Sequence, residues 1–185
     1  MALTESNMLP IGTAAPTFTL PDTVSGNHLS LEDLASNKAT VIMFICNHCP
    51  YVIHVNPEIK RLSDEYIAKG VSFLAISSND VDNYPADAPH LMTKLVEEEA
   101  FNFPYLYDES QTVAKAYDAA CTPDFYVFDK ELKLAYRGRL DESRPNSGKP
   151  LTGKDLREAI DTVLAGEKVG DLQYPSAGCN IKWKR

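Results

Sequence analysis

Two cysteines three residues apart stand where an apolar segment of the sequence ends. The segment reads VIMFICNHCPYV, with Cys46 and Cys49 on either side of Asn47 and His48, and with Pro50 directly after them. In a reducing compartment, a close Cys-x-x-Cys pair is typical of redox catalysis or metal binding rather than of a structural disulfide. The pair therefore predicts thiol–disulfide exchange or a metal site.

Cys49 is the predicted nucleophile because a proline follows it. Proline favours the first turn of a helix, so Pro50 places Cys49 at the N-cap. A sulfur at that position lies near unpaired backbone N–H groups and the positive end of the helix dipole, which lowers its pKa. We expect Cys49 to attack at a site open to substrate, and Cys46 to resolve the resulting mixed disulfide.

Neighbouring residues leave alternatives open. His48 as a cation would favour the thiolate of either cysteine and protonate a leaving thiolate, or it is a loop imidazole in water. Cys121 is either a third redox thiol or a small buried residue. For Cys179 we favour a packed or idle thiol over a tail that folds back across the site.

A metal site is the competing interpretation of the thiols. Thiolates with imidazole suit zinc or copper, and the candidate ligands are Cys46, Cys49, Cys121 and either His48 or His54. No second Cys-x-x-Cys and no His-x-x-x-His completes the set. We therefore predict no metal and no other cofactor.

Secondary-structure patterns place the cysteines between a strand and a helix. Residues 40–46 are apolar throughout and predict a strand buried on both faces. An apolar stripe then follows helical spacing, and Gly70 ends that helix. Further elements are expected at 71–77, 90–99, 105–107, 111–117, 124–129 and 133–138, with a last helix that opens at Thr152 in a capping box with Asp155. This order favours a mixed central sheet with helices on both faces.

Composition sets the broad class of the protein. The 185 residues are 44% hydrophobic and 24% charged, which suits one domain over residues 1–185. The first residues, MALTESNMLPIG, lack the features of a secretory signal, and no segment is apolar enough to span a bilayer, so we expect a cytoplasmic protein. The net charge of −8 argues against nucleic acid or an anionic membrane as a partner.

Several motifs resemble the thioredoxin superfamily, and more closely its peroxiredoxin-related proteins with an N-H-C-P-Y-V signature. They are this signature itself, Pro57 inside the predicted helix, the segment CTPDFYVF, the segment GTAAPTFTLPD and the ending GCNIKW. The resemblance implies an α/β thioredoxin-like fold, with a central mixed β-sheet flanked by helices. It also implies an N-terminal β extension over about 1–38, an inserted loop–helix segment and a C-terminal tail over about 166–185.

The resemblance also assigns a role to the residues around Pro123. It implies that the Thr122–Pro123 bond is cis and lies beside Cys49. Thr122 would then present backbone groups to an extended substrate, and Cys121 would lie one residue from the substrate groove.

The sequence departs from both parent patterns. A thioredoxin has its second cysteine three residues after the nucleophile, where this chain has Val52. A peroxiredoxin has proline seven residues before its reactive cysteine and threonine three before, where this chain has Ile42 and Cys46. The missing threonine hydroxyl argues against peroxide activation, whereas a thiol at that place offers a disulfide partner.

We therefore predict a thiol–disulfide oxidoreductase. Its partners would be a disulfide-bearing protein or a small-molecule thiol or peroxide, together with an electron-donating reductant. A thiol peroxidase, in which Cys49 becomes a sulfenic acid, is one alternative. A non-catalytic metal-binding or redox-sensing module is the other.

Overall fold

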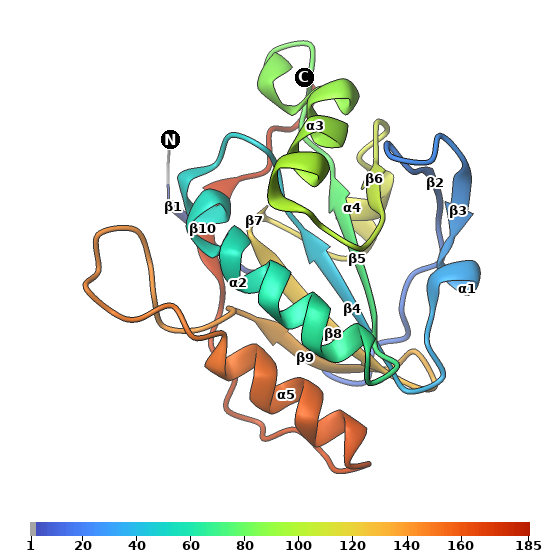
Figure 1. The fold of residues 1–185 in the computed structure, drawn as a ribbon, viewed down its shortest axis with the longest axis vertical. Helices are drawn as coiled ribbons and strands as arrows, with labels where there is room; N and C mark the ends of the chain where they lie inside the picture. The colour runs from blue at the N-terminus through green and yellow to red at the C-terminus, as the bar shows by residue number, and fades with distance from the viewer. Residues whose placement is uncertain (1–2) are drawn as a thin grey trace.

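A five-stranded mixed sheet forms the centre of the computed structural model, which describes residues 3–185 (Figure 1). The strand order is β6-β5-β4-β8-β9. β4, β5 and β6 are parallel, while β8 is antiparallel to both β4 and β9. The strands span Ala39–Phe44 (β4), Ser72–Ser77 (β5), Tyr105–Tyr107 (β6), Asp124–Asp129 (β8) and Leu134–Gly138 (β9). This arrangement confirms the predicted mixed sheet.

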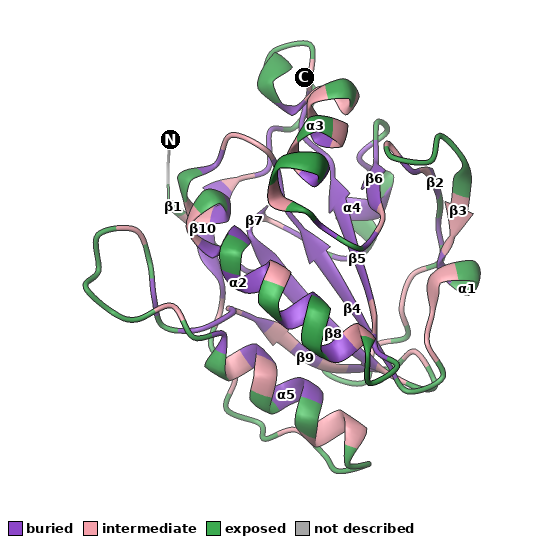
Figure 2. Ribbon diagram, in the orientation of Figure 1, coloured by how far each residue is buried: buried purple, intermediate pink, exposed green. Residues whose placement is uncertain are grey.

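Helices cover both faces of this sheet, because both faces of its central strand are apolar. In β4, Val41 and Met43 pack into one buried cluster, and Ile42 and Phe44 pack into another. The first cluster is covered by α2 (Pro50–Ile67), α3 (Pro89–Glu99) and α5 (Lys154–Leu164). The second is covered by α1 (Leu31–Leu34) and α4 (Thr112–Ala116). Figure 2 shows that the strands between these helices are buried.

Two shorter segments extend the central unit. Near the N-terminus, β2 (Thr19–Pro21) and β3 (His28–Ser30) pair as an antiparallel hairpin. Between β5 and α3, the chain forms a short 3-10 helix, η1 (Pro85–Asp87), in a segment that the sequence analysis treated only as a loop.

A second sheet brings the two ends of the chain together, and the sequence analysis did not predict it. Its strands are β1 (Leu3–Glu5), β10 (Ala177–Asn180) and β7 (Cys121–Thr122), with β10 in the middle. Both pairings are antiparallel. In Figure 1 the red C-terminal strand β10 lies beside the start of α2. The C-terminal tail therefore returns to the region where the two cysteines are located.

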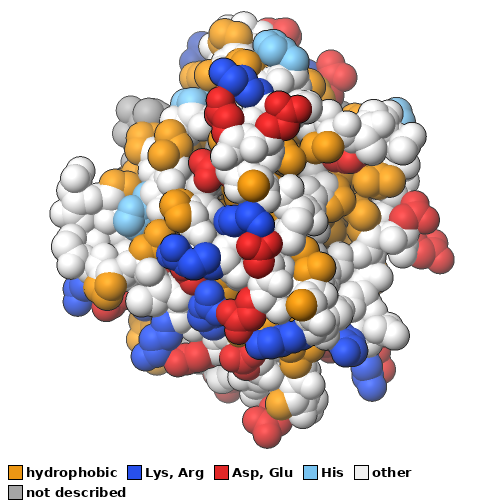
Figure 3. Space-filling view, in the orientation of Figure 1, with side chains coloured by type: hydrophobic (Ala, Val, Ile, Leu, Met, Phe, Trp, Pro, Cys, Tyr) orange, Lys and Arg blue, Asp and Glu red, His pale blue; other side chains and the backbone are white. Residues whose placement is uncertain are grey.

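Charged side chains cover the outside of α2 and α5. Figure 3 shows basic and acidic groups interspersed over this face. Arg157 on α5 bridges the two helices, because its Nη2 lies 2.8 Å from Oε1 of Glu58 on α2. None of the helices in the described part of the chain combines the length and the apolar character that crossing a bilayer requires.

The predicted capping box at the start of α5 is wrong. Gly153 occupies the N-cap with φ of 65°, a left-handed conformation, and no side chain caps from that position. Instead, Oδ2 of Asp141 accepts hydrogen bonds of 2.7 Å from the backbone N–H groups of Thr152 and Gly153. Asp155 pairs with Arg139, whose Nε lies 2.5 Å from Oδ2. A carboxylate from the preceding loop thus replaces the cap that the local sequence suggested.

Replacing this remote cap tests its contribution to stability. We expect Asp141→Ala to lower the free energy of unfolding by about 1–3 kcal/mol, because buried backbone donors lose a charged acceptor. Urea denaturation measures the change. Glu142→Ala is the matched control, since Glu142 is exposed and the substitution removes only its ion pair with Lys149, in which Nζ lies 3.5 Å from Oε2. Equal stability of the two variants would contradict the assignment.

Candidate active site

Cys49 lies at the N-cap of α2, directly before Pro50, at the position that the sequence predicts. Its exposed fraction is 0%, so the expectation of a site open to substrate is wrong for this conformation. Its Sγ lies 2.6 Å from Sγ of Cys179 and 3.4 Å from the carbonyl oxygen of Thr122. The sulfur is therefore enclosed by the two strands β7 and β10.

Neighbouring thiols lower the pKa of Cys49 to about 5, mainly through a hydrogen bond from Cys46. Burial opposes this shift, and further hydrogen bonds from the Cys179 thiol and from the backbone N–H of Val52 support it. The amide-rich helix end therefore contributes, as expected, but less than the thiol of Cys46. At neutral pH Cys49 is a thiolate, which is the reactive form of cysteine.

Cys46 lies two residues after the end of β4 and is also buried. Its pKa is well above the ordinary value, first because its proton is shared with Cys49, then because of burial and the nearby charge of Asp87. Its Sγ lies 3.4 Å from Oγ1 of Thr122. Cys46 therefore remains a protonated thiol that donates to Cys49.

Asp87 on η1 organises the segment between the two cysteines, and the sequence analysis missed it. Its carboxylate is fully buried, and Oδ1 accepts from the backbone N–H groups of Asn47 at 2.8 Å and His48 at 3.3 Å. Oδ2 accepts from Nδ2 of Asn79 at 2.7 Å. No local pattern in the proline-rich segment of residues 79–89 distinguishes this aspartate from a solvated one.

The imidazole of His48 is held in place rather than free in water. Nδ1 lies 2.7 Å from Oδ2 of Asp87, and the ring stacks on Tyr84 at 6.1 Å between centroids and 7° between planes. Ligand-type atoms of Cys46, His48 and Asp87 lie within 4.8 Å of one another. Among the described residues, this group does not include Cys49, Cys121 or His54, so the structure does not bring together the full ligand set of the competing metal interpretation.

Thr122 connects the two sulfurs of the Cys-x-x-Cys pair. Its hydroxyl contacts Cys46, its carbonyl contacts Cys49, and its peptide bond to Pro123 is cis. Cys121 points elsewhere, because its Sγ lies 3.9 Å from the carbonyl oxygen of Pro123 and 4.0 Å from that of Ser176. Burial raises the pKa of the Cys121 thiol, which suits a packed residue.

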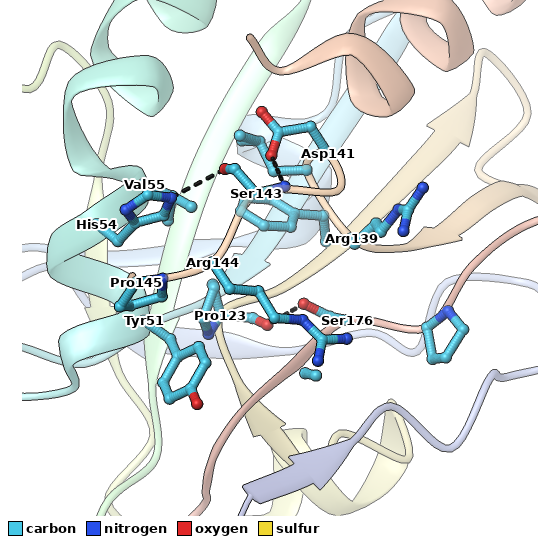
Figure 4. A pocket seen from close by; sticks show the side chains of 14 residues that line it. Tyr51, His54, Val55, Pro123, Arg139, Asp141, Ser143, Arg144, Pro145 and Ser176 are labelled. Carbon is cyan, nitrogen blue, oxygen red and sulfur yellow. Dashed lines mark hydrogen bonds between the residues drawn. The ribbon is translucent and has the colours of Figure 1, made fainter. Parts of the chain in front are cut away.

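A small pocket opens beside Pro123 (Figure 4). Figure 4 shows His54 from α2 and Ser143 from the loop between β9 and α5 on its wall, with 2.9 Å between Nε2 and Oγ. Residues 175–177, which lead into β10, complete the lining together with Tyr51 and Arg144. His54 therefore belongs to this pocket and not to the sulfur cluster.

Comparison with known protein families identifies the family to which the residues around these cysteines belong. The model of the AhpC/TSA family matches residues 11–137, which is more than half of the chain. The chain belongs to the AhpC/TSA family. The match includes Cys46, Cys49 and Thr122 of this AhpC/TSA-family protein, but it ends before Cys179. A search of curated proteins gave no match.

Solved structures similar to this AhpC/TSA-family protein agree with its fold. An uncharacterized conserved protein from Geobacillus kaustophilus is 59% identical, with a TM-score of 0.98 over 100% of this chain and 97% of that one. A hypothetical protein from Sinorhizobium meliloti 1021 is 44% identical, with a TM-score of 0.95 over 98% of both chains. The thioredoxin domain of a thiol-disulfide oxidoreductase from Bacteroides vulgatus is 21% identical, with a TM-score of 0.66 over 84% of this chain and 99% of that one. The fold is therefore thioredoxin-like, as predicted.

Titration of the Cys49 thiol tests the electrostatics of the cluster. We expect the ultraviolet absorbance of thiolate, taken as wild type minus Cys49→Ser, to appear with a midpoint at pH of about 5. The thiolate is present above this midpoint and is lost as the pH falls through it. Cys46→Ala removes the main hydrogen bond and should raise the midpoint, whereas Cys121→Ala should leave it unchanged. A wild-type midpoint near the free-cysteine value of about 8.5 would refute the cluster.

Proposed function

We propose that this protein is a thiol–disulfide oxidoreductase in which Cys49 is the nucleophile. The observation that carries the proposal is a cysteine at a helix N-cap in contact with a further thiol of the same chain, an environment that lowers its pKa to about 5. A nucleophile that is ionised at neutral pH and a second thiol within reach are two requirements of thiol–disulfide exchange. The third is access for the substrate, which requires a movement of the strands that enclose Cys49.

The reaction begins with attack of the Cys49 thiolate on one sulfur of a disulfide. A bond forms between Cys49 and that sulfur, the substrate disulfide breaks, and the departing thiolate takes a proton from solvent. A second thiol of the protein then attacks Sγ of Cys49, loses its proton to the departing group and leaves an internal disulfide. An external dithiol reductant then reduces the internal disulfide and restores the two thiols of the protein. The sequence makes Cys46 the first candidate for the resolving thiol.

Asp87 and His48 would set the protonation states of the groups that react. Asp87 lies near Cys46 and disfavours its ionisation, which keeps a proton donor beside the Cys49 thiolate. The same carboxylate holds His48 through Nδ1. We propose that His48 relays the proton from solvent to the first departing thiolate, because its side chain is partly exposed while both cysteines beside it are buried. Consistent with the sequence, we place the reaction in the cytoplasm, where reducing thiols are available.

A thiol peroxidase is the second candidate, and the enclosure of Cys49 favours it. A sulfur with 0% exposure is more easily reached by a hydroperoxide than by a protein disulfide. In that reaction Cys49 would take one oxygen and become a sulfenic acid, and a neighbouring thiol would condense with it and release water. Against it, the hydroxyl nearest the site, Oγ1 of Thr122, contacts Cys46 rather than Cys49.

Disulfide reduction by single-cysteine variants separates these candidates. The reduced wild-type protein should release thiols from oxidised glutathione, and Cys49→Ser should lower this rate by about 10³-fold or more. Cys121→Ser is the matched control, because it removes a buried thiol whose Sγ faces the backbone carbonyls of Pro123 and Ser176 rather than Cys49.

The same variants are then offered hydrogen peroxide. Peroxide consumption that depends on Cys49, without reduction of oxidised glutathione, would replace the oxidoreductase proposal by the peroxidase. If Cys49→Ser and Cys121→Ser lose the same fraction of both activities, the loss reflects a folding defect and not a catalytic role of Cys49.

A further inference from the structure

Strand β10 carries Cys179 to the nucleophile through its register with β7. Cys179 stands opposite Thr122 in this antiparallel pair, and opposite Leu3 in the pair with β1. Thr122 is the residue whose carbonyl contacts Sγ of Cys49. The pairing therefore brings Cys179 to the same point from the other side, with 2.6 Å between the two sulfurs.

Gly178 allows β10 to come this close. A Cβ at residue 178 would lie 2.0 Å from the carbonyl oxygen of Thr122 and 3.2 Å from Cδ of Pro123. Real Cβ atoms do not tolerate the first of these distances, so any other residue would force the strand away from β7. The glycine directly before Cys179 thus sets the depth at which its thiol enters the site.

Contacts on both sides of β10 hold the strand in place. Before it, the backbone N–H of Ser176 donates to Oγ of Ser6 at 2.8 Å. After it, the N–H of Ile181 donates to the carbonyl of Ala120 at 3.0 Å, and the N–H of Lys182 donates to Oδ1 of Asn79 at 2.9 Å. The contact between the sulfurs is therefore built into the fold and is not a chance approach of a loose tail.

We infer that Cys179 is the resolving thiol of this site, so that the oxidised protein contains a Cys49–Cys179 disulfide. The inference rests on the proposed function, because it requires Cys49 to be the nucleophile. A disulfide holds its sulfurs at about 2.05 Å, so only a small movement separates the present contact of 2.6 Å from a bond. Cys46 then acts as a positioning residue that stabilises the Cys49 thiolate.

The electrons and protons balance without a further co-reactant. Cys49 as thiolate attacks the substrate disulfide, and the first substrate thiolate takes one proton from solvent. Cys179, a thiol whose pKa is raised to about 12 first by burial and then by its hydrogen bond to Cys49, attacks Sγ of Cys49 and gives its proton to the second substrate thiolate. The substrate disulfide is reduced to two thiols, and Cys49 and Cys179 are oxidised to one disulfide.

The pocket of Figure 4 lies beside the entry to β10, and the residues that line it include no cysteine. It borders Pro123 on one side and residues 175–177 on the other, which is where the chain enters β10. Because Cys49 is fully buried, a substrate sulfur that enters here must displace the start of β10 before it contacts Cys49. Resolution then needs a movement of β10 over a short distance, while its two ends stay attached.

Disulfide mapping of the wild-type protein tests the inference without any variant. The reduced protein is treated with one equivalent of dithiodipyridine, digested at low pH and analysed by mass spectrometry. We expect a peptide pair that links Cys49 to Cys179. A link between Cys46 and Cys49 would overturn the inference and leave the proposed function standing. A product without Cys49 would overturn both.

The stoichiometry of thiol release tests the role of each cysteine. Under the same treatment, wild type and Cys46→Ser should release two thiopyridone molecules per molecule of probe, with a slower first release in Cys46→Ser. Cys179→Ser should release one and keep the other half of the probe bound to Cys49. Release of two thiopyridone molecules by Cys179→Ser and of one by Cys46→Ser would refute the inference.

Gly178→Ala keeps all four cysteines and tests the position of the strand. The added Cβ displaces β10, and with it Cys179, from Thr122. We therefore expect release of the second thiopyridone to slow by at least tenfold, while release of the first does not slow. A second release as fast as in wild type would contradict the role of β10. Circular dichroism of each variant against wild type shows whether the fold is kept, and Cys121→Ser serves as the control that should behave as wild type.

Discussion

A negative charge on a buried sulfur is the constraint on which this site depends. Burying an ion is costly unless hydrogen bonds replace its hydration. Around Cys49 that replacement comes from the thiols of Cys46 and Cys179 and from the N–H of Val52. The buried carboxylate of Asp87 adds a second charge nearby and makes ionisation of Cys46 unfavourable. The two thiols of the Cys-x-x-Cys pair are therefore unequal, since one is held as the anion and the other as its donor.

Each donor to this anion comes from a different part of the fold. The end of β4 supplies Cys46, the first turn of α2 supplies Val52, and β10 supplies Cys179. Because Cys179 lies 130 positions after Cys49 in the sequence, the thiolate gains its last donor only when the smaller sheet forms beside the central one, while its main donor, Cys46, lies within the central unit. The second sheet is thus part of the site and does more than fasten the two termini together.

The predictable parts of the molecule are those with a regular pattern. The apolar segment of β4, the stripe of α2 and the proline at its start correctly predicted the strand-to-helix junction and the N-cap position of Cys49. The parts that were missed have no pattern of their own. β7 has two residues and β10 reads AGCN, so their strand character comes from pairing with each other and with β1. Asp87 likewise gains its role only when η1 folds against the cysteine loop.

The same physical reason explains the error at α5. Thr152 followed by Asp155 fits a capping box, but the left-handed conformation of Gly153 shifts the start of the helix by a residue. Asp141 then supplies the acceptor from eleven residues upstream. The local capping-box pattern does not form here, because a charged acceptor that is distant in sequence binds the backbone N–H groups at the start of the helix.

Activation and enclosure of Cys49, the proposed nucleophile, come mainly from different parts of the chain. The residues that match the AhpC/TSA family include Cys46 and Cys49 and end at residue 137, whereas the strand that covers them begins at Ala177. A thiolate at neutral pH reacts with any oxidant that reaches it and is then exposed to further oxidation. A cover that itself carries a thiol limits both risks, because access is narrow and any oxidised sulfur has a partner in contact. The C-terminal segment therefore limits access to Cys49 and adds a further donor, while the residues that match the family supply Cys49 itself and its main donor, Cys46.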